Sequence, residues 1–290
     1  MSWRTVVISN RCKLDLSMGY MVVRGEETRR IFIDEIAVLM IENPAVSMTG
    51  CLLEELTSKK VRIIFCDSKR SPYAELAPYI GSHDSTRKLK RQMAWTEGRR
   101  GLIWSYIVRE KIYNQSKILL ENDHDREADM LTNYANEMEF ADKTNREGHA
   151  AKVYFNALFG KDFSRGKECP KNAALNYGYG LILSAFNREV TLCGYITQLG
   201  IHHDNVFNHY NLSSDLMEPF RPFVDRIVLA EDPVKFEHEE KLPLVSMLSS
   251  PVMFAGEEQT LLNAIKLYTK RTLDAMSSDE DDPSLDFPEL

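Results

Sequence analysis

Apolar and polar positions alternate in short runs along the first eighty residues. The runs are rich in Val and Ile and are separated by turn residues, a pattern typical of β-strands with one exposed face. The predicted strands are residues 5–9, 13–16, 20–24, 29–33, 35–41, 46–49 and 61–66. One helix is predicted at residues 50–58, where leucines recur at helical spacing, and Pro72 predicts a loop after the last strand. The N-terminal part is therefore predicted to be a small, mostly β domain.

From about residue 85 the apolar positions recur every three or four residues, which is the period of a helix with one buried face. The segment 87–115 lacks proline and predicts one long helix, for which Asp84, Ser85 and Thr86 are candidate caps. Further helices are predicted at residues 115–122, 125–139, 147–159, 173–188, 191–200, 215–231 and 257–272, and loops at 160–169 and 202–214.

The predicted fold class is α+β, in three parts. A β-rich domain at residues 1–84 is followed by an all-α domain at residues 85–275. The tail at residues 276–290 holds six acids and no base, and this composition predicts disorder.

Charge is distributed unevenly along the chain. The 290 residues carry a net charge of −7, which disfavours nucleic-acid binding, but without the six acids of the tail the net charge is −1. Six bases stand against one acid in residues 87–100: Arg87, Lys88, Lys90, Arg91, Arg99 and Arg100. This concentration is compatible with DNA binding on one face, although charge alone favours a solvated helix face.

Several classes of protein are excluded. The five cysteines form no CxxC pair, which argues against a disulfide framework and against a thiolate zinc site. No apolar run approaches the ~20 residues that a bilayer requires. The first fifteen residues contain four charged side chains, unlike the apolar core of a signal peptide. We therefore expect a cytoplasmic protein that does not associate with membranes.

Imidazoles and carboxylates gather at the ends of predicted helices. His202 and His203 end one predicted helix, and Glu218 lies near the start of the next. The prolines Pro219 and Pro222 place Glu218 there, because proline is tolerated only in the first turn of a helix.

Glu147 adds a carboxylate in the opening turn of another predicted helix. Oxygen ligands with one imidazole suit Mg²⁺ or Mn²⁺ better than Zn²⁺. The plainer interpretation, which spacing alone favours, is that Glu147 is an acid stabilised by the helix dipole and that the histidines are loop residues.

Three segments, in this order, resemble the CRISPR-associated integrase family, the larger of the two proteins that capture new spacers. They are Glu147-Gly-His-Ala-Ala-Lys-Val-Tyr-Phe155, Asn172-Ala-Ala-Leu-Asn-Tyr-Gly-Tyr-Gly180, and Leu199-Gly-Ile-His-His203 with Asp215-Leu-Met-Glu-Pro-Phe-Arg-Pro222. The N-terminal half also fits, and the segment 66–70 is similar to the lineage found in type II systems. The resemblance extends from the first strand to about residue 270.

The resemblance implies that Glu147, His203 and Glu218 are both the catalytic residues and the metal ligands. His203 is preferred to His202 because the family's histidine stands three residues after a glycine, here Gly200. The implied cofactor is Mg²⁺ or Mn²⁺.

The implied reaction is a transesterification, in which the 3′-hydroxyl of an incoming DNA end attacks a phosphodiester at the edge of a CRISPR repeat. Water in place of that hydroxyl gives endonuclease activity. Arg146 and Arg221 flank the implied ligands and, with the six bases of residues 87–100, are candidate contacts to DNA phosphates.

The resemblance also implies partners. These are double-stranded DNA (prespacer and repeat), a second copy of the chain bound through the β domains, and a small ferredoxin-like protein in a heterohexamer. Type II systems add a ring-shaped DNA-binding protein and an RNA-guided effector nuclease. Two other functions remain open: a non-catalytic DNA-binding scaffold, which the intact ligand set disfavours, and a hydrolase of small phosphoesters, which the basic segment disfavours.

Overall fold

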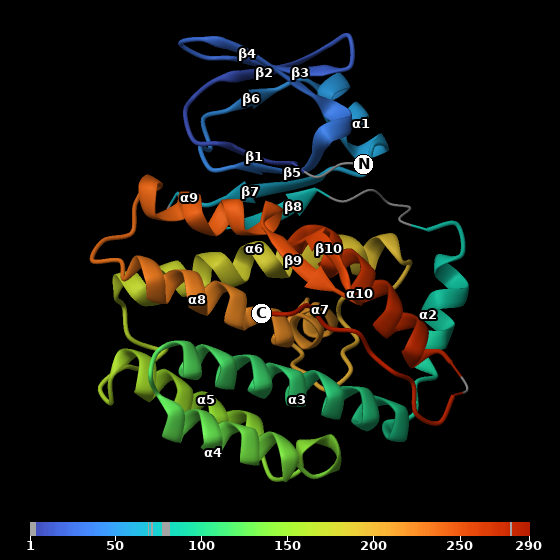
Figure 1. Cartoon of the computed structure of the whole chain (residues 1–290). Coiled ribbons are helices and arrows are strands. Elements are labelled where there is room, and N and C mark those ends of the chain that lie inside the picture. The colour runs from blue at the N-terminus through green and yellow to red at the C-terminus, as the bar shows by residue number, and fades with distance from the viewer. Residues whose placement is uncertain (1–3, 69, 71, 77–81, 279) are drawn as a thin grey trace.

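Two four-stranded sheets form the N-terminal part of the chain in the computed structural model, which describes residues 4–68, 70, 72–76, 82–278 and 280–290 (Figure 1). The strand orders are β1-β5-β7-β8 and β4-β3-β2-β6. The strands are β1 (Arg4–Ile8), β2 (Lys13–Ser17), β3 (Tyr20–Arg24), β4 (Thr28–Phe32), β5 (Ile36–Ile41), β6 (Ser47–Met48), β7 (Arg62–Cys66) and β8 (Pro72–Leu76). Helix α1 (Gly50–Ser58) packs beside them.

The first sheet is buried on both faces. Every residue of β5 is buried, because alternate side chains enter different cores. Leu39 and Ile41 belong to the core of the N-terminal part, whereas Val38 and Met40 belong to the core of the helical part. The sheet therefore joins the two parts through packed apolar side chains.

Helices form the rest of the chain, with α3, α4 and α5 at the end opposite the sheets (Figure 1). Helix α6 is buried over most of its length and contacts α7, α8, α9 and α10. The helices are α2 (Ser85–Met93), α3 (Glu97–Glu121), α4 (Asp125–Asn136), α5 (Arg146–Phe159), α6 (Pro170–Leu192), α7 (Asn211–Leu216), α8 (Arg221–Glu231), α9 (His238–Ser246) and α10 (Leu261–Met276). The predicted α+β class is confirmed. No helix in the described ranges has both the length and the apolar character needed to cross a bilayer.

The long helix predicted at residues 87–115 is instead two helices. The chain breaks before Thr96, whose hydroxyl accepts a hydrogen bond from the backbone N–H of Arg99 (3.2 Å) and so begins α3. Helix α3 then continues to Glu121 and includes the segment predicted as a separate helix at 115–122. The predicted domain boundary near residue 84 adjoins the start of α2, and residues 77–81 beside it lie outside the described residues.

Three other predicted elements were wrong. The loop predicted after residue 66 contains β8, which pairs antiparallel with β7. The helix predicted at 191–200 is absent among these described residues, because α6 runs on to Leu192 and ends before Gly194, whose φ is 85°. The start of the helix predicted at 257–272 is a hairpin of β9 (Pro251–Phe254) and β10 (Glu257–Thr260), joined by Ala255 and Gly256, both at positive φ.

The acidic tail, whose composition predicts disorder, lies against the helical part. Glu289 donates its backbone N–H to the Met253 carbonyl (2.8 Å), and Asp286 forms an ion pair with Arg271. Three apolar side chains of the tail pack on the core: Leu285, Phe287 and Leu290. The prediction used the average composition of the tail, which is dominated by acids, and so did not take these three apolar side chains into account.

We predict that Gly178→Ala lowers the free energy of unfolding by about 1–3 kcal/mol, because α6 and α8 pack too closely for a methyl group there. A Cβ at Gly178 would lie 2.4 Å from Cγ1 of the buried Val224. Gly180→Ala is the matched control on the same helix, since its Cβ would meet Pro72 Cγ at an ordinary 3.5 Å. Urea denaturation measures both, and equal stabilities of the two variants would contradict the prediction.

Candidate active site

A buried lysine lies between the two carboxylates singled out in the sequence. Glu147 lies in the first turn of α5, and Glu218 begins a 3-10 turn (Glu218–Phe220) that leads into α8. Lys111, from the middle of α3, donates its Nζ to Glu147 Oε1 (2.6 Å) and to Glu218 Oε2. The structure therefore brings Glu147 and Glu218 together on one shared cation.

The charges in this cluster stabilise one another. Burial lowers the pKa of Lys111, but the carboxylates of Glu218 and Glu147 outweigh it and the pKa lies above its ordinary value. Burial raises the pKa of Glu218, but Arg221 and Lys111 outweigh that effect and hold the pKa below its ordinary value. Arg221 also donates its Nε to Glu218 Oε1 at 2.8 Å. Glu218 is therefore a carboxylate, and Lys111 an ammonium, at neutral pH.

The start of α5 is capped by a residue other than Glu147. The carboxylate of Asp142 accepts hydrogen bonds from the backbone N–H groups of Arg146 (2.7 Å) and Glu147 (3.0 Å). These are donors that a helix N-terminus leaves without intrahelical partners. The carboxylate of Glu147 takes no part in these hydrogen bonds and pairs with Lys111.

The loop before α7 wraps around the carboxylate of Asp215. This fully buried carboxylate accepts the backbone N–H groups of Ile201 (2.6 Å), His202 (2.9 Å) and His203 (3.1 Å). A Cβ on Gly200 would lie 2.3 Å from the His203 carbonyl oxygen and 2.7 Å from Asp215 Oδ2. Gly200, three residues before His203, is thus required because the His203 carbonyl and the Asp215 carboxylate leave no room for a side chain.

The two adjacent histidines have different surroundings. The ring of His202 stacks on the buried Trp104, with centroids 4.3 Å apart. The Nδ1 atom of His203 forms a hydrogen bond with Asp215, which raises the pKa of His203 above its ordinary value, with smaller contributions from Glu218 and Glu147. In the neutral tautomer that donates Nδ1–H to Asp215, the Nε2 atom of His203 keeps a lone pair that can bind a metal ion, and metal-bound histidines commonly hold their other nitrogen in this way.

The carboxylates of Glu147 and Glu218 and the imidazole of His203 are ligands that suit a divalent ion. These three side chains do not, however, form a preassembled metal site. Glu147 and Glu218 already share one cation, and His203 has one ring nitrogen fixed by Asp215. Within the described part of the chain, no group of three His, Cys, Asp or Glu side chains is arranged to hold a metal ion.

A cavity of about 230 Å³ borders the two carboxylates. Arg165 and Arg221 line it beside Lys111, and Arg165 is oriented by Asn176 Oδ1 (2.7 Å). Lys111 and Arg165 were not predicted as site residues. The sequence did contain an indication that Lys111 is buried, because Lys111 continues the helical spacing of the buried residues Trp104 and Ile107.

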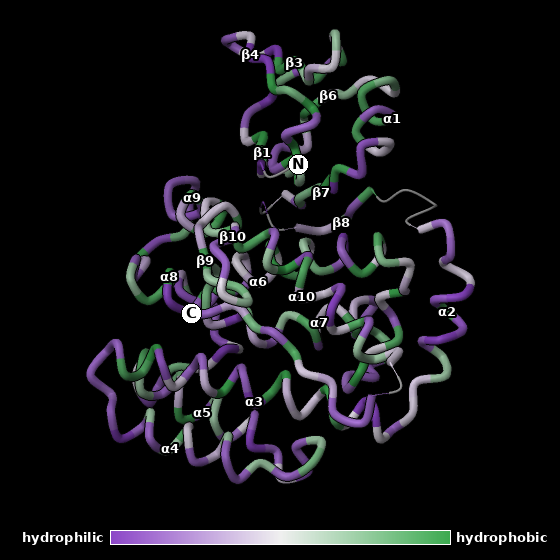
Figure 2. The backbone as a smooth tube through the Cα atoms, turned by 45° about the vertical axis from the view of Figure 1, so that its right-hand side comes forward, coloured by the Kyte–Doolittle hydropathy of each residue, from purple (hydrophilic) through white to green (hydrophobic). Residues whose placement is uncertain are grey.

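The six basic residues of the predicted DNA-binding segment lie on two helices. Helix α2 carries Arg87, Lys88, Lys90 and Arg91 at the edge of the molecule, where the backbone is coloured hydrophilic (Figure 2). Arg99 and Arg100 lie on α3, where Arg99 donates to the backbone carbonyls of Ser278 and Glu280 in the tail. The break before α3 separates the two groups.

Arg221 lies beside the carboxylate of Glu218, whereas Arg146, next to Glu147 in the sequence, pairs with Glu137 (3.5 Å). The guanidinium of Arg221 lies over the ring of Tyr179 at 4.7 Å, and that of Arg146 lies over Tyr134 at 5.0 Å. Of the two, Arg221 lines the cavity and contacts Glu218 directly.

Comparison with known proteins identifies the family of the chain. The model of a family described as CRISPR associated protein Cas1 matches residues 5–231, which include all three predicted ligands. The chain belongs to the Cas1 family. It is 36% identical over 230 residues to "CRISPR-associated endonuclease Cas1" of Neisseria meningitidis serogroup C, covering 79% of this chain and 76% of that protein.

Solved structures share the Cas1 fold. A Cas1 protein from Thermotoga maritima has a TM-score of 0.78 at 18% identity, covering 97% of this chain and 99% of that one. The structure "Casposase bound to integration product" has a TM-score of 0.77 at 17% identity, covering 97% and 92%. A chain of a "Cas6-RT-Cas1--Cas2 complex" has a TM-score of 0.76 at 18% identity, covering 99% of this chain, which spans only 36% of that chain.

We predict that Lys111→Met lowers the free energy of unfolding by about 3 kcal/mol, because it leaves the carboxylates of Glu147 and Glu218 without their shared cation. Lys117→Met is the control, since Lys117 is exposed on the same helix. Chemical denaturation in EDTA gives both values. A loss no greater than that of the control would show that the buried ion pairs do not stabilise the protein.

Proposed function

We propose that the chain is a metal-dependent DNA integrase of CRISPR adaptation with an associated endonuclease activity. The observation that carries the proposal is the convergence of Glu147 and Glu218 on one buried cation, near an imidazole whose Nδ1 is held by Asp215. Support comes from the 36% identity to a protein named an endonuclease and from the fold shared with a casposase bound to an integration product.

Mg²⁺ or Mn²⁺ is the proposed cofactor, with Glu147, Glu218 and the Nε2 atom of His203 as ligands. When bound, such an ion supplies Lewis-acid stabilisation of charge on the attacked phosphate and lowers the pKa of the attacking hydroxyl. Lys111 pairs with both carboxylates, and Arg221 supplies a second positive charge beside Glu218.

The residues of the chain bind and orient DNA in this proposal. Arg221 and Arg165 line the cavity beside the carboxylates and are placed to hold non-bridging oxygens of the scissile phosphate. Arg146 and the basic residues of α2 and α3 contact the backbone further away. The 3′-oxygen of the incoming strand forms a bond to phosphorus, and the bond from phosphorus to the 3′-oxygen of the repeat strand breaks. One phosphodiester replaces another, so no ATP is consumed.

The proposed assembly is a homodimer formed through the β parts and bound to a small ferredoxin-like partner in a heterohexamer. A solved chain that covers 99% of this one belongs to a structure named a Cas1–Cas2 complex, which supports such a partner. The ring-shaped DNA-binding protein and the RNA-guided effector nuclease of type II systems are further proposed partners. The proposed location is the cytoplasm.

A second candidate function is a non-catalytic DNA-binding scaffold of the same complex. It is favoured by one observation: in the described residues the three ligands do not form a ready metal cluster. The two functions differ in whether DNA joining depends on the carboxylates.

We expect Glu218→Gln to abolish metal-dependent strand transfer, because it removes a charged oxygen ligand. The assay joins a short duplex with 3′-hydroxyl ends to supercoiled DNA that carries the repeat, with the small partner present and either Mg²⁺ or Mn²⁺. Glu231→Gln is the matched control, since Glu231 is exposed at the end of α8. Joining by wild type that EDTA and Glu218→Gln abolish would support the integrase. Assembly and duplex binding without any joining would favour the scaffold.

A further inference from the structure

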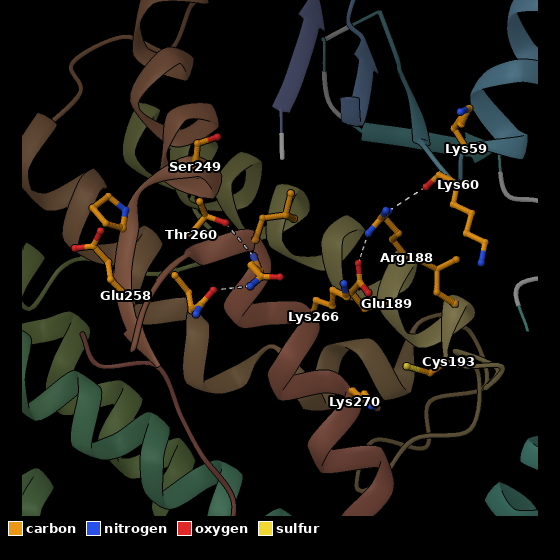
Figure 3. A pocket seen from close by; sticks show the side chains of 15 residues that line it. Lys59, Lys60, Arg188, Glu189, Cys193, Ser249, Glu258, Thr260, Lys266 and Lys270 are labelled. Atoms are coloured by element: carbon orange, nitrogen blue, oxygen red, sulfur yellow. Dashed lines mark hydrogen bonds and ion pairs between the residues drawn. The ribbon is translucent and has the colours of Figure 1, made fainter. Parts of the chain in front are cut away.

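A second cavity, of about 910 Å³, lies where the β part meets the helical part (Figure 3). It shares no lining residue with the cavity beside Glu147 and Glu218. Its five cations come from three elements: Lys59 and Lys60 after α1, Arg188 in α6, and Lys266 and Lys270 in α10. Two acids, Glu189 and Glu258, leave a net charge of +3 at the cavity, in a chain whose net charge is −7.

Three of these cations are exposed lysines without an acidic partner. Within the part of the chain that the structure describes, no carboxylate makes an ion pair with Lys60, Lys266 or Lys270. The other two cations are engaged. Lys59 pairs with Asp34 (2.8 Å), and Arg188 pairs with Glu189. The uncompensated charge therefore faces solvent, where an anion can reach it.

The backbone of Lys60 is in the left-handed conformation, with φ of 60°. Glycine adopts this conformation at the end of a helix with the least steric cost, so a lysine is unfavourable there. The Lys60 carbonyl accepts a hydrogen bond from Arg188 Nε (3.1 Å), which ties this turn to α6. Among the described non-glycine residues at positive φ, Lys60 is the one that lines this cavity.

The lining of the cavity selects the chemistry of the anion. Among the residues that line it there is no aromatic side chain, so it offers no ring on which a nucleic-acid base can stack. Its lysines are spread over several elements, an arrangement suited to a ligand with several phosphate groups along its length. Lys266 and Lys270 are one turn apart on α10, about 6 Å along the helix axis.

Helix α2 brings a further lysine close to the cavity. A Cβ on Gly194 would lie 3.4 Å from Lys88 Cγ, and the neighbouring Cys193 lines the cavity. Burial raises the pKa of the Cys193 thiol to about 11, the carboxylates of Glu189 and Asp274 add to that rise, and the ammoniums of Lys88 and Lys270 oppose it. Lysines of α2 and α10 thus both lie near Cys193, together with these two acids.

We propose that this cavity binds the phosphodiester backbone of duplex DNA, as a contact separate from the catalytic carboxylates. The inference rests on the proposed function only in taking DNA as the polyanion. Contacts of this kind add affinity and position the duplex without reading its sequence.

The first test is the double variant Lys266→Gln/Lys270→Gln in the full chain. Fluorescence anisotropy of a labelled duplex is measured in EDTA over a series of salt concentrations, so that catalysis plays no part. We expect the Kd to rise at least about tenfold near 0.1 M salt, and the slope of log K against log salt to fall by about 2. Lys13→Gln/Lys235→Gln is the control, because it changes the net charge equally at two exposed lysines outside the cavity.

The second test is Lys60→Gly, which separates binding from folding. Glycine suits the left-handed turn, so the Tm should stay equal or rise while DNA affinity falls and the salt slope decreases by about 1. Wild-type affinity in both cavity variants, or an equal loss in the control, would overturn the proposal. Strand transfer is measured on the same preparations. Tight duplex binding by wild type without joining would count against the integrase and not against this cavity.

Discussion

The enclosure of one ammonium between two carboxylates constrains the whole helical part. Lys111, Glu147 and Glu218 come from three separate elements, and Lys111 and Glu218 lose their hydration when those elements pack, whereas Glu147 stays partly exposed. Desolvation of an unpaired charge costs several kcal/mol, so the elements are stable only in positions that bring the charges into contact. The requirement explains why Arg221 also pairs with Glu218 inside the same cluster. It also explains why two acids can lie side by side in a largely buried site.

The junction between the β part and the helical part is also fixed by buried side chains that must find partners, but most of these side chains are apolar. Apolar side chains from opposite faces of β5 join both cores, and a polar contact accompanies them. The buried carboxylate of Glu42 accepts hydrogen bonds from Tyr177 on α6 (3.0 Å) and from Ser9 (2.8 Å). The β part and helical part are thus held by packing and by specific hydrogen bonds, and the edge of this junction is where the lysine-lined cavity opens.

Periodicity predicted most strands, the α+β class and the helix that carries Glu147, because these elements bury one face at a regular spacing. The helix predicted at 215–231 is instead the end of α7, a 3-10 turn that begins at Glu218, and α8 from Arg221. Periodicity could not locate the break before Thr96, where no proline or glycine marks the end of α2, nor the apolar anchors of the acidic tail. The roles of Glu147, His203 and Glu218 came from resemblance and not from periodicity, and they remain predictions. Lys111 was missed because a lysine is normally assigned to the solvent face, and only its position in an apolar stripe distinguished it.

The loop between His203 and α7 is anchored at several points. Thr197 Oγ1 donates to the His209 carbonyl (2.7 Å), and the Asn211 amide donates to the Asn205 carbonyl (3.1 Å). Asp215 holds three successive backbone N–H groups from a fully buried position, so the imidazole is fixed by residues on either side of the intervening segment. Within that segment Val206 and Phe207 are more than four-fifths exposed. These two exposed positions can therefore change in sequence during evolution while the imidazole stays in place, which makes them a surface on which related proteins can acquire different contacts around an unchanged centre.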